Sequence, residues 1–227
     1  MAIEALRGST SASNAERRLF ITSLFEMMLE RGLIVNLQCP QYGDDTVYRL
    51  TIAGLGDVAI IQKGCPDGAH SSQAWTVPTW ATETYLWWMC DSLNYHPGTH
   101  VAKGVKRLQK RFFSDSAGAL DGTIFHNQIC GTARRPCMKA YHGVTIGNQV
   151  VPPPCVYIMP DAGDGDTWNW QGDRVREFPN TLLSLFNIPT NLISAYIGHI
   201  GFQRRGNRVK TTISSRFGPA RSTMYRS

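Results

Sequence analysis

A lysine and several aspartates could, by type, form a metal-dependent nuclease site. Such a site needs two or more carboxylates that bind a divalent cation and a lysine beside the attacking water. Lys63 follows an apolar run, and Asp44 or Asp45 could supply the first carboxylate. The second acid is expected two residues before the lysine, but that position is Ile61, and Asp57 lies six residues before it. The nuclease pattern is therefore incomplete.

Two histidines and two cysteines form a possible zinc-binding set. These residues lie within 17 positions of one another and are His126, Cys130, Cys137 and His142. Structural zinc sites usually contain a Cys-x-x-Cys pair, which this sequence lacks. Isolated cysteines in a β protein are more often small buried apolar residues. We therefore predict no metal and no cofactor.

The other patterns of catalytic or ion-binding residues are also incomplete. The acidic stretch at residues 161–166 resembles a calcium loop, but counting from Asp164 places Trp168 at position five and Val175 at position twelve, where an EF-hand needs a glutamate. The chain has no Gly-x-Ser-x-Gly turn, no Walker loop and no dinucleotide fingerprint. We therefore expect the protein not to be an enzyme.

The basic residues fall into two clusters. The segment from Phe178 to Ser227 has no acidic residue but has seven basic ones: Arg204, Arg205, Arg208, Lys210, Arg216, Arg221 and Arg226. The other cluster consists of Lys103, Lys106, Arg107, Lys110 and Arg111. Such clusters indicate either nucleic-acid binding or pairing with acidic surface on another copy, since arginine forms bidentate contacts with carboxylates. Both interpretations stay open.

A helix is predicted near the N-terminus. Ser13 or Asn14 can cap it, Glu16 stands three residues after Ser13 as in a capping box, and Gly32 is the stop signal. Two four-residue series of apolar side chains lie between: Phe20, Leu24 and Met28, and Ile21, Phe25 and Leu29. These cover more of the circumference than one core-facing stripe needs. The helix is therefore either central to its own fold or packed against another molecule.

The remainder of the chain is predicted to be mainly β. Residues 33–37, 47–52 and 58–61 are predicted to form an antiparallel meander with a turn at 43–45. The segment from Trp75 to Leu93 is predicted to be helical from Thr79, and 101–113 is ambiguous between helix and strand. Beyond residue 120, short apolar runs separated by glycine, proline and asparagine are typical of a β-sandwich.

The expected class is therefore α+β: an antiparallel β-sandwich with an N-terminal helix and one or two further helices. We expect residues 1–32 to form an N-terminal arm and helix. Residues 33–227 are expected to form the β-sandwich domain with its basic C-terminal segment.

Composition excludes several classes of protein. With 42% hydrophobic and 18% charged residues, the 227-residue chain is not disordered. Residues 1–12 lack the features of a secretory signal, and polar residues and a proline interrupt the apolar region from Leu182 to Phe202, so no membrane helix is predicted. Six cysteines without a secretory signal are expected to be free thiols in an intracellular compartment.

The ionisable residues predict a large change of charge in alkali. The formal net charge is +6 at pH 7. At about pH 10 and above, lysines lose their protons while eight tyrosines and six cysteines become anions, whereas arginine stays charged. Contacts between copies that involve tyrosine would therefore weaken at high pH.

The segment Glu16-Arg17-Arg18-Leu19-Phe20, at the start of the predicted helix, resembles the charged Arg-Leu-Phe segment near the start of cypovirus polyhedrins. A strand, the turn at residues 42–45 and a second strand follow in an order similar to the first hairpin of that family. The resemblance covers residues 14–50, about a sixth of the chain. It implies a β-sandwich whose N-terminal helix reaches neighbouring molecules. It also implies homotrimers that pack into crystals in the cytoplasm of infected host cells.

By this resemblance the protein is a structural, self-assembling component of viral occlusion bodies, which embed virus particles and dissolve at alkaline pH. The helix would clamp adjacent subunits, and the basic C-terminal segment would pair with acidic loops such as residues 161–166. The residues expected to mediate assembly are Arg18, Leu19, Phe20, Leu24, Phe25, Met28, Arg204, Arg205 and Arg208. The expected partners are other copies of the chain and virus particles, with no membrane. The alternative is a metal-dependent nuclease or a basic nucleic-acid-binding module.

Overall fold

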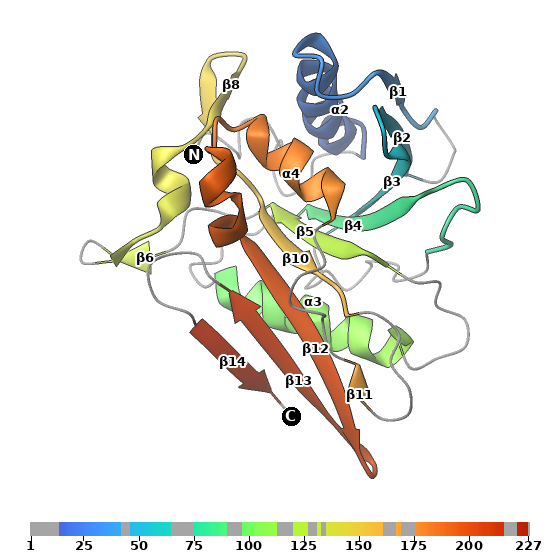
Figure 1. Cartoon of the computed structure of the whole chain (residues 1–227), viewed down its shortest axis with the longest axis vertical. Helices are drawn as coiled ribbons and strands as arrows, with labels where there is room; N and C mark the ends of the chain where they lie inside the picture. Colours follow the sequence, from blue (N-terminus) through green and yellow to red (C-terminus); the bar gives the residue numbers. More distant parts are fainter. Residues whose placement is uncertain are drawn as a thin grey trace.

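A computed structural model of the chain describes residues 14–41, 46–64, 75–89, 97–112, 120–126, 131–132, 135–160, 167–168, 176–215 and 222–226. Within these residues one large mixed sheet has the strand order β1-β2-β3-β4-β5-β10-β12-β13-β14, and β11 pairs with β12 (Figure 1). Its strands are β1 (Asn36–Gln38), β2 (Val47–Ile52), β3 (Gly56–Lys63), β4 (Glu83–Met89), β5 (Gly122–His126), β10 (Cys155–Ile158), β11 (Thr167–Trp168), β12 (Ile197–Arg205), β13 (Arg208–Ser215) and β14 (Ser222–Arg226). Two small hairpins pair β6 (Gly131–Thr132) with β7 (Arg135–Pro136), and β8 (Val144–Ile146) with β9 (Gln149–Val151).

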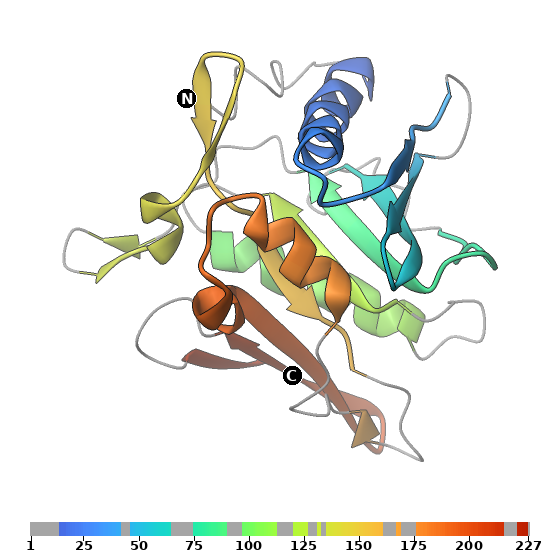
Figure 2. The same ribbon diagram turned by 45° about the horizontal axis from the view of Figure 1, so that its top comes forward.

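Helices cover both faces of the large sheet. They are α2 (Asn14–Glu30), α3 (Pro97–Phe112) and α4 (Glu177–Ser184), with 3-10 helices η1 (Met138–Tyr141) and η2 (Thr190–Tyr196). Helices α2 and α4 lie on one face and α3 on the other, as the two views of the chain show (Figures 1 and 2). This mixed α/β structure agrees with the predicted α+β class. Among the described residues, no helix is both long and apolar enough to cross a membrane.

The first three strands form the predicted antiparallel meander, with Asn36 opposite Thr51 and Val47 opposite Ile61. The remainder of the sheet differs from the predicted antiparallel sandwich, because β3–β4, β4–β5 and β10–β12 pair in parallel. Parallel neighbours need long crossover connections. Helix α3 lies in the crossover from β4 to β5, and α4 and η2 lie in the crossover from β10 to β12. The described strands of the large sheet therefore form one layer between helices.

The helix predicted from Thr79 is wrong, because this segment forms a turn followed by strand β4. Trp87 and Trp88 point to opposite faces of the sheet and both are buried. A strand that is covered on both faces is apolar at every position and loses the alternation that identifies a strand. The dense apolar run was therefore mistaken for a helix.

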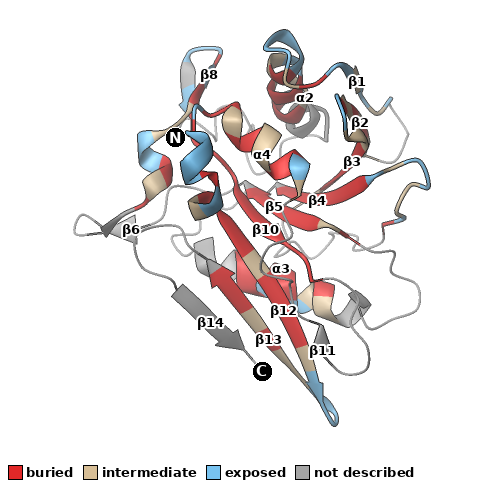
Figure 3. Cartoon of the chain, in the orientation of Figure 1, coloured by how far each residue is buried: buried red, intermediate tan, exposed pale blue. Residues whose placement is uncertain are grey.

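Two apolar cores lie on opposite faces of the sheet. The α2 core contains Trp87, Ile124 and the inner sides of α2 and α4. The α3 core contains the next residue of each strand, Trp88 and Phe125, with the apolar side of α3. Figure 3 shows the buried residues along the central strands and the exposed tip of the β12–β13 hairpin.

Helix α2 occupies the range in which the sequence predicted a helix. It ends before Gly32, whose φ of +68° lies in the left-handed region. The N–H of Leu33 donates to the carbonyl of Met28 at 2.9 Å, which closes the helix in the manner of a Schellman motif. The ring of Phe25 makes edge contacts with Tyr48 at 5.3 Å and Trp87 at 5.8 Å between centroids. These contacts anchor α2 to the sheet of its own chain.

Helix α3 approaches the sheet closely at Gly104. A Cβ atom at this position would lie 2.8 Å from Cζ of Phe125 and 3.2 Å from Cζ3 of Trp88. Both rings are buried in the α3 core. A glycine is therefore required for the observed separation between helix and sheet.

Helix α4 begins at a buried carboxylate. Glu83, 5% exposed, accepts hydrogen bonds from the backbone N–H groups of Glu177 at 3.0 Å and Phe178 at 3.2 Å. It also accepts one from the Tyr85 hydroxyl at 2.7 Å. A carboxylate at a helix N-terminus satisfies donors that have no partner within the helix and interacts favourably with the helix dipole. Glu83, the first residue of β4, thereby connects this strand to α4.

Candidate nucleic-acid interface

Helix α3 is amphipathic, which resolves the ambiguity of residues 101–113. Val101, Val105 and Leu108 are buried in the α3 core. Lys103 and Lys106 are exposed on the opposite side of the helix, and Arg107 is half-buried. The helix therefore presents basic side chains away from the sheet.

The hairpin of β12 and β13 carries basic side chains on both faces near its tip. Phe202 lies in the α3 core, and strand side chains alternate, so Arg204 is on the same face as Phe202. The opposite face carries Arg205, Arg208 and Lys210. Arg205 pairs with Arg208, and Lys210 pairs with Gln203, which is two residues before Arg205 and shares its face. The three arginines are exposed.

A direct hydrogen bond joins the helix to the hairpin. The Thr211 hydroxyl donates to Oε1 of Gln109 at 2.9 Å, although the two residues are 102 positions apart. Arg204 pairs with Val209, which is two positions before Thr211. Arg204 therefore lies about 7 Å along the strands from the bond between Thr211 and Gln109. The fold thus places the basic residues of α3 on the same side of the sheet as Arg204, whereas the other basic residues of the hairpin lie on its opposite face. We name the seven basic residues of these two adjoining elements the basic patch. The basic patch consists of Lys103, Lys106, Arg107, Arg204, Arg205, Arg208 and Lys210.

The basic patch has electrostatic features that favour an anionic ligand. No acidic residue occurs in the sequences of α3, β12 or β13. Arg205 and Arg208 stand directly opposite each other in the hairpin. Like charges at such a position destabilise a strand pair, so their placement is costly without an anion between or beside them. Arg205 also donates from Nε to Oε1 of Gln203 at 3.2 Å, which fixes its direction.

The structure places the predicted assembly residues of α2 differently from the expectation. Phe20, Leu24, Phe25 and Met28 are at most 1% exposed and lie in the α2 core of their own chain. They offer no surface to a neighbouring molecule, which favours the alternative that the helix is central to its own fold. Leu19 is 64% exposed. The side chain of Arg18 lies outside the described residues.

Among the residues that the structure describes, the candidate nuclease residues Asp57 and Lys63 lie far apart, and of the zinc set only the side chains of Cys137 and His142 are described. Asp57 is bound to Arg49 and Thr51 and stands six strand residues, about 20 Å, from Lys63. Cys137 is buried, and His142 packs edge-on against Tyr196 at 5.6 Å between ring centroids. The described part of the chain contains no group of three metal-ligating side chains.

Several predicted features lie outside the described residues. These are the turn at 43–45 with Asp44 and Asp45, Cys130, the acidic stretch at 161–166, Arg216 and Arg221. The side chains of Lys110, Arg111, His126 and Arg226 are also outside the described part.

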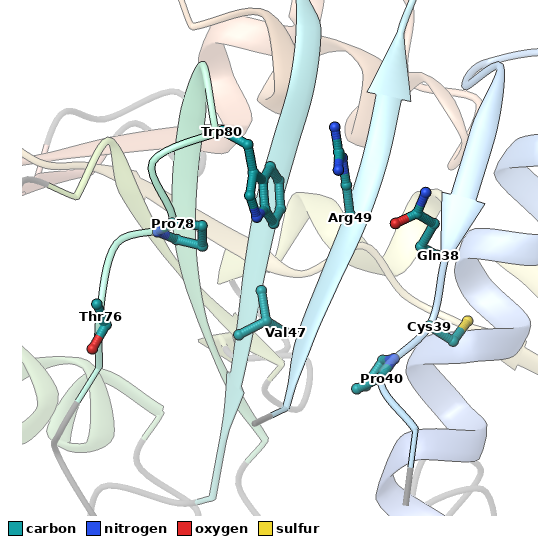
Figure 4. A pocket seen from close by; sticks show the side chains of 8 residues that line it. All are labelled: Gln38, Cys39, Pro40, Val47, Arg49, Thr76, Pro78 and Trp80. Carbon is teal, nitrogen blue, oxygen red and sulfur yellow. The ribbon is translucent and has the colours of Figure 1, made fainter. Parts of the chain in front are cut away.

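Sequence reasoning missed a pocket at the outer face of β1 and β2. It has a volume of about 370 Å³ and is lined by Gln38, Cys39, Pro40, Val47, Arg49, Thr76, Pro78 and Trp80 (Figure 4). We name it the Trp80 pocket. Its floor is β2, and its walls are the end of β1 and residues 76–80 (Figure 4). The signal in the sequence was a single proline, Pro78, between Trp75 and Trp80, which is not specific.

Charged and nucleophilic groups border the Trp80 pocket. The guanidinium carbon of Arg49 lies 4.7 Å from the centroid of the Trp80 ring, a cation–π arrangement. Arg49 also donates from Nε to Oδ2 of Asp57 at 2.9 Å, and from Nη2 to the same oxygen. Hydrogen bonds from Arg49 and Thr51 hold the pKa of Asp57 below its usual value. Burial raises the pKa of the Cys39 thiol.

Comparisons with known proteins identify no relative. No protein-family model matches the chain, and neither the curated proteins nor the solved structures contain a match.

Proposed function

We propose that this protein binds nucleic acid through the basic patch. The observation that carries the proposal is the junction of α3 and the β12–β13 hairpin at Gln109 and Thr211, which joins two basic clusters from distant parts of the chain. The surface is made by regular elements, so the backbone positions that carry its charges are held at fixed separations.

The chemistry of the basic patch fits phosphate contacts. Lysine and arginine neutralise backbone phosphates and release condensed counterions, which gives affinity without sequence preference. Because Arg204 and the pair Arg205–Arg208 lie on opposite faces of the hairpin, a nucleic-acid strand can contact the tip from both sides. Binding of this type depends strongly on salt concentration.

The test compares two double variants that each remove two positive charges. Lys103→Gln/Lys106→Gln changes the basic patch, and Arg17→Gln/Arg31→Gln changes two basic residues in or directly after α2, which packs on the other face of the sheet. Affinity for a fluorescently labelled oligonucleotide would be measured by anisotropy between 50 and 200 mM salt. We expect the patch variant to bind more weakly and to lose roughly 1.4–1.8 from the slope of log affinity against log salt, whereas the matched control keeps the slope of the unmodified protein.

Equal affinities of the two double variants at every salt concentration would contradict the proposal. So would an absence of binding by the unmodified protein at 50 mM salt. Circular dichroism of each variant would establish that it is folded before its affinity is compared.

We also propose, on the resemblance to cypovirus polyhedrins, that the protein self-assembles into a viral occlusion-body matrix. Exposed apolar side chains favour this second function. Leu19 is 64%, Tyr141 70% and Val150 64% exposed. Contiguous exposed apolar groups mark contacts between proteins, and of these three residues Leu19 is one of those expected to mediate assembly. The exposed arginines Arg204, Arg205 and Arg208 would then pair with carboxylates of a neighbouring copy.

Expression in insect cells tests the assembly proposal. We expect cytoplasmic crystals with the unmodified chain and none with Leu19→Asp, because a carboxylate cannot be buried in an apolar contact without a large cost. Thr190→Asp, a change at another exposed position, is the control and should still form crystals. A chain that stays dispersed at high concentration and neutral pH would exclude this function.

A further inference from the structure

The Trp80 pocket opens on the same face of the sheet as α3. Val47 packs against the α3 core, whereas the next residue, Tyr48, lies in the α2 core. Arg49 is two residues after Val47 and therefore shares its face. The pocket and the exposed side of α3 thus lie on one side of the sheet.

The wall of the Trp80 pocket is held in place by backbone hydrogen bonds. The N–H of Thr82 donates to the carbonyl of Asp57 at 2.8 Å, which ties the segment to β3. The N–H of Ala81 donates to the carbonyl of Pro78 at 3.2 Å and closes the turn that carries Trp80. The pocket is therefore formed before any ligand binds.

The lining of the pocket suits a flat, neutral ring. Asp57 offsets the charge of Arg49, so the pocket does not carry the excess positive charge that a phosphate needs. Arg49 covers one face of the Trp80 ring, so a base would stack on the other face of Trp80 or on the outer side of the guanidinium, while Val47, Pro40 and Pro78 supply apolar contacts. The Gln38 amide and Thr76 hydroxyl can exchange hydrogen bonds with the edge of a heterocycle.

We propose that the Trp80 pocket stacks one unpaired base of a single-stranded nucleic acid whose phosphates contact the basic patch; this inference rests on the proposed nucleic-acid function. Stacking on aromatic side chains is the usual way in which proteins hold unpaired bases without reading sequence. A volume of about 370 Å³ lies within the range of small-ligand sites.

The separation between the pocket and the α3 part of the basic patch matches a short stretch of nucleic acid. The pocket floor is β2, and α3 packs over β4 and β5 at Gly104. Adjacent strands are about 4.8 Å apart, so the pocket lies roughly 10–15 Å across the sheet from α3, whereas the β12–β13 hairpin is five to six strands, roughly 24–29 Å, from β2. A few nucleotides can span the distance from the pocket to α3.

The experiment uses three ligands and four variants of the full chain. The ligands are a single-stranded oligonucleotide, the duplex of the same sequence and inorganic polyphosphate. The variants are Trp80→Ala, Trp80→Phe, Thr76→Trp and Lys103→Gln/Lys106→Gln. Thr76→Trp fills the pocket from an exposed position and leaves the Trp80–Arg49 pair in place, so it serves as an independent test where Trp80→Ala fails to fold.

Removal or blocking of the pocket should affect only the ligand with unpaired bases. We expect Trp80→Ala and Thr76→Trp to weaken binding of the single strand by roughly 5- to 100-fold and to leave polyphosphate binding unchanged. Trp80→Phe keeps an aromatic ring and should retain most of the affinity. Lys103→Gln/Lys106→Gln should weaken binding of all three ligands.

The stacking inference is overturned by either of two outcomes: unchanged single-strand affinity in both pocket variants, or an equal loss for polyphosphate and single strand. The proposed nucleic-acid function fails by a different result: the variant Lys103→Gln/Lys106→Gln binds all three ligands as tightly as the unmodified protein. The two failures are therefore distinguishable within one set of measurements.

Discussion

Glu83 and Tyr85 show how one buried acidic residue organises its surroundings. The Glu83 carboxylate accepts three hydrogen bonds, two of them from the start of α4. The Tyr85 phenol that donates the third is itself fully buried. Burial, and next the nearby negative charge of Glu83, raise the pKa of Tyr85 well above its usual value.

The raised pKa of Tyr85 predicts a loss of stability in alkali. Unfolded tyrosine has a pKa of about 10, so folded Tyr85 retains its proton to higher pH than the unfolded chain does. Its contribution to the free energy of unfolding is complete below about pH 10 and is lost as pH rises toward the folded pKa. Denaturant titrations between pH 8 and pH 11.5 should show this fall, at about 1.4 kcal/mol per pH unit for one proton.

The variant Tyr85→Phe isolates this effect. It lacks the titrating group, so its stability should decrease less steeply above pH 10 than that of the unmodified protein, although it is less stable at pH 7 by about 1–2 kcal/mol through loss of the bond to Glu83. Tyr141→Phe, at a tyrosine that is 70% exposed, is the matched control and should follow the unmodified protein. A Tyr85→Phe curve parallel to that of the unmodified protein above pH 10 would show that this phenol does not govern alkaline stability.

At the level of elements, the packing of α3 on the sheet depends on Gly104. An alanine in a helix is normally favoured over glycine by up to about 1 kcal/mol. Here the added methyl group would collide with Phe125 and Trp88, both buried. We expect Gly104→Ala to lower the free energy of unfolding by about 1–3 kcal/mol, as overpacked cores do, measured by denaturant titration.

Phe125→Leu in the Gly104→Ala background supplies the control, since a smaller side chain makes room for the added methyl group. The double variant should be less destabilised than the sum of the two single changes. Strict additivity, or a Gly104→Ala protein that is more stable than the unmodified one, would argue against the close contact.

The sequence predicted correctly those elements that a local pattern of residues identifies. It predicted the wrong element where burial on both faces of a strand removed the alternation of apolar and polar residues. The stop signal of Gly32 and the alternation of residues 47–52 are local, and the structure has α2 and the meander in those places. Strand β4 is buried on both faces, so its apolar run carries no period. Helix α3 was ambiguous because its mixture of basic and apolar residues is compatible with an amphipathic helix and with an alternating strand.

At the scale of the whole molecule, the basic patch depends on strand order. The sequence showed both basic clusters, but it could not show that β13 lies beside α3, because this requires β5 to pair with β10 and β10 to pair in parallel with β12. The Trp80 pocket was invisible for the same reason, since residues 38–40 and 47–49 meet residues 76–80 only through the β2–β3–β4 order. Both candidate sites are products of topology and not of any motif.

The position of β12 and β13 in the sheet has a consequence for biosynthesis. Ile200, Phe202 and Ile213 close the α3 core from the C-terminal side. During translation, α3 is therefore complete about one hundred residues before its final neighbours leave the ribosome. For that interval its apolar stripe, with Val105 and Leu108, lacks part of its cover, and a nascent chain at this stage is a natural client for chaperones.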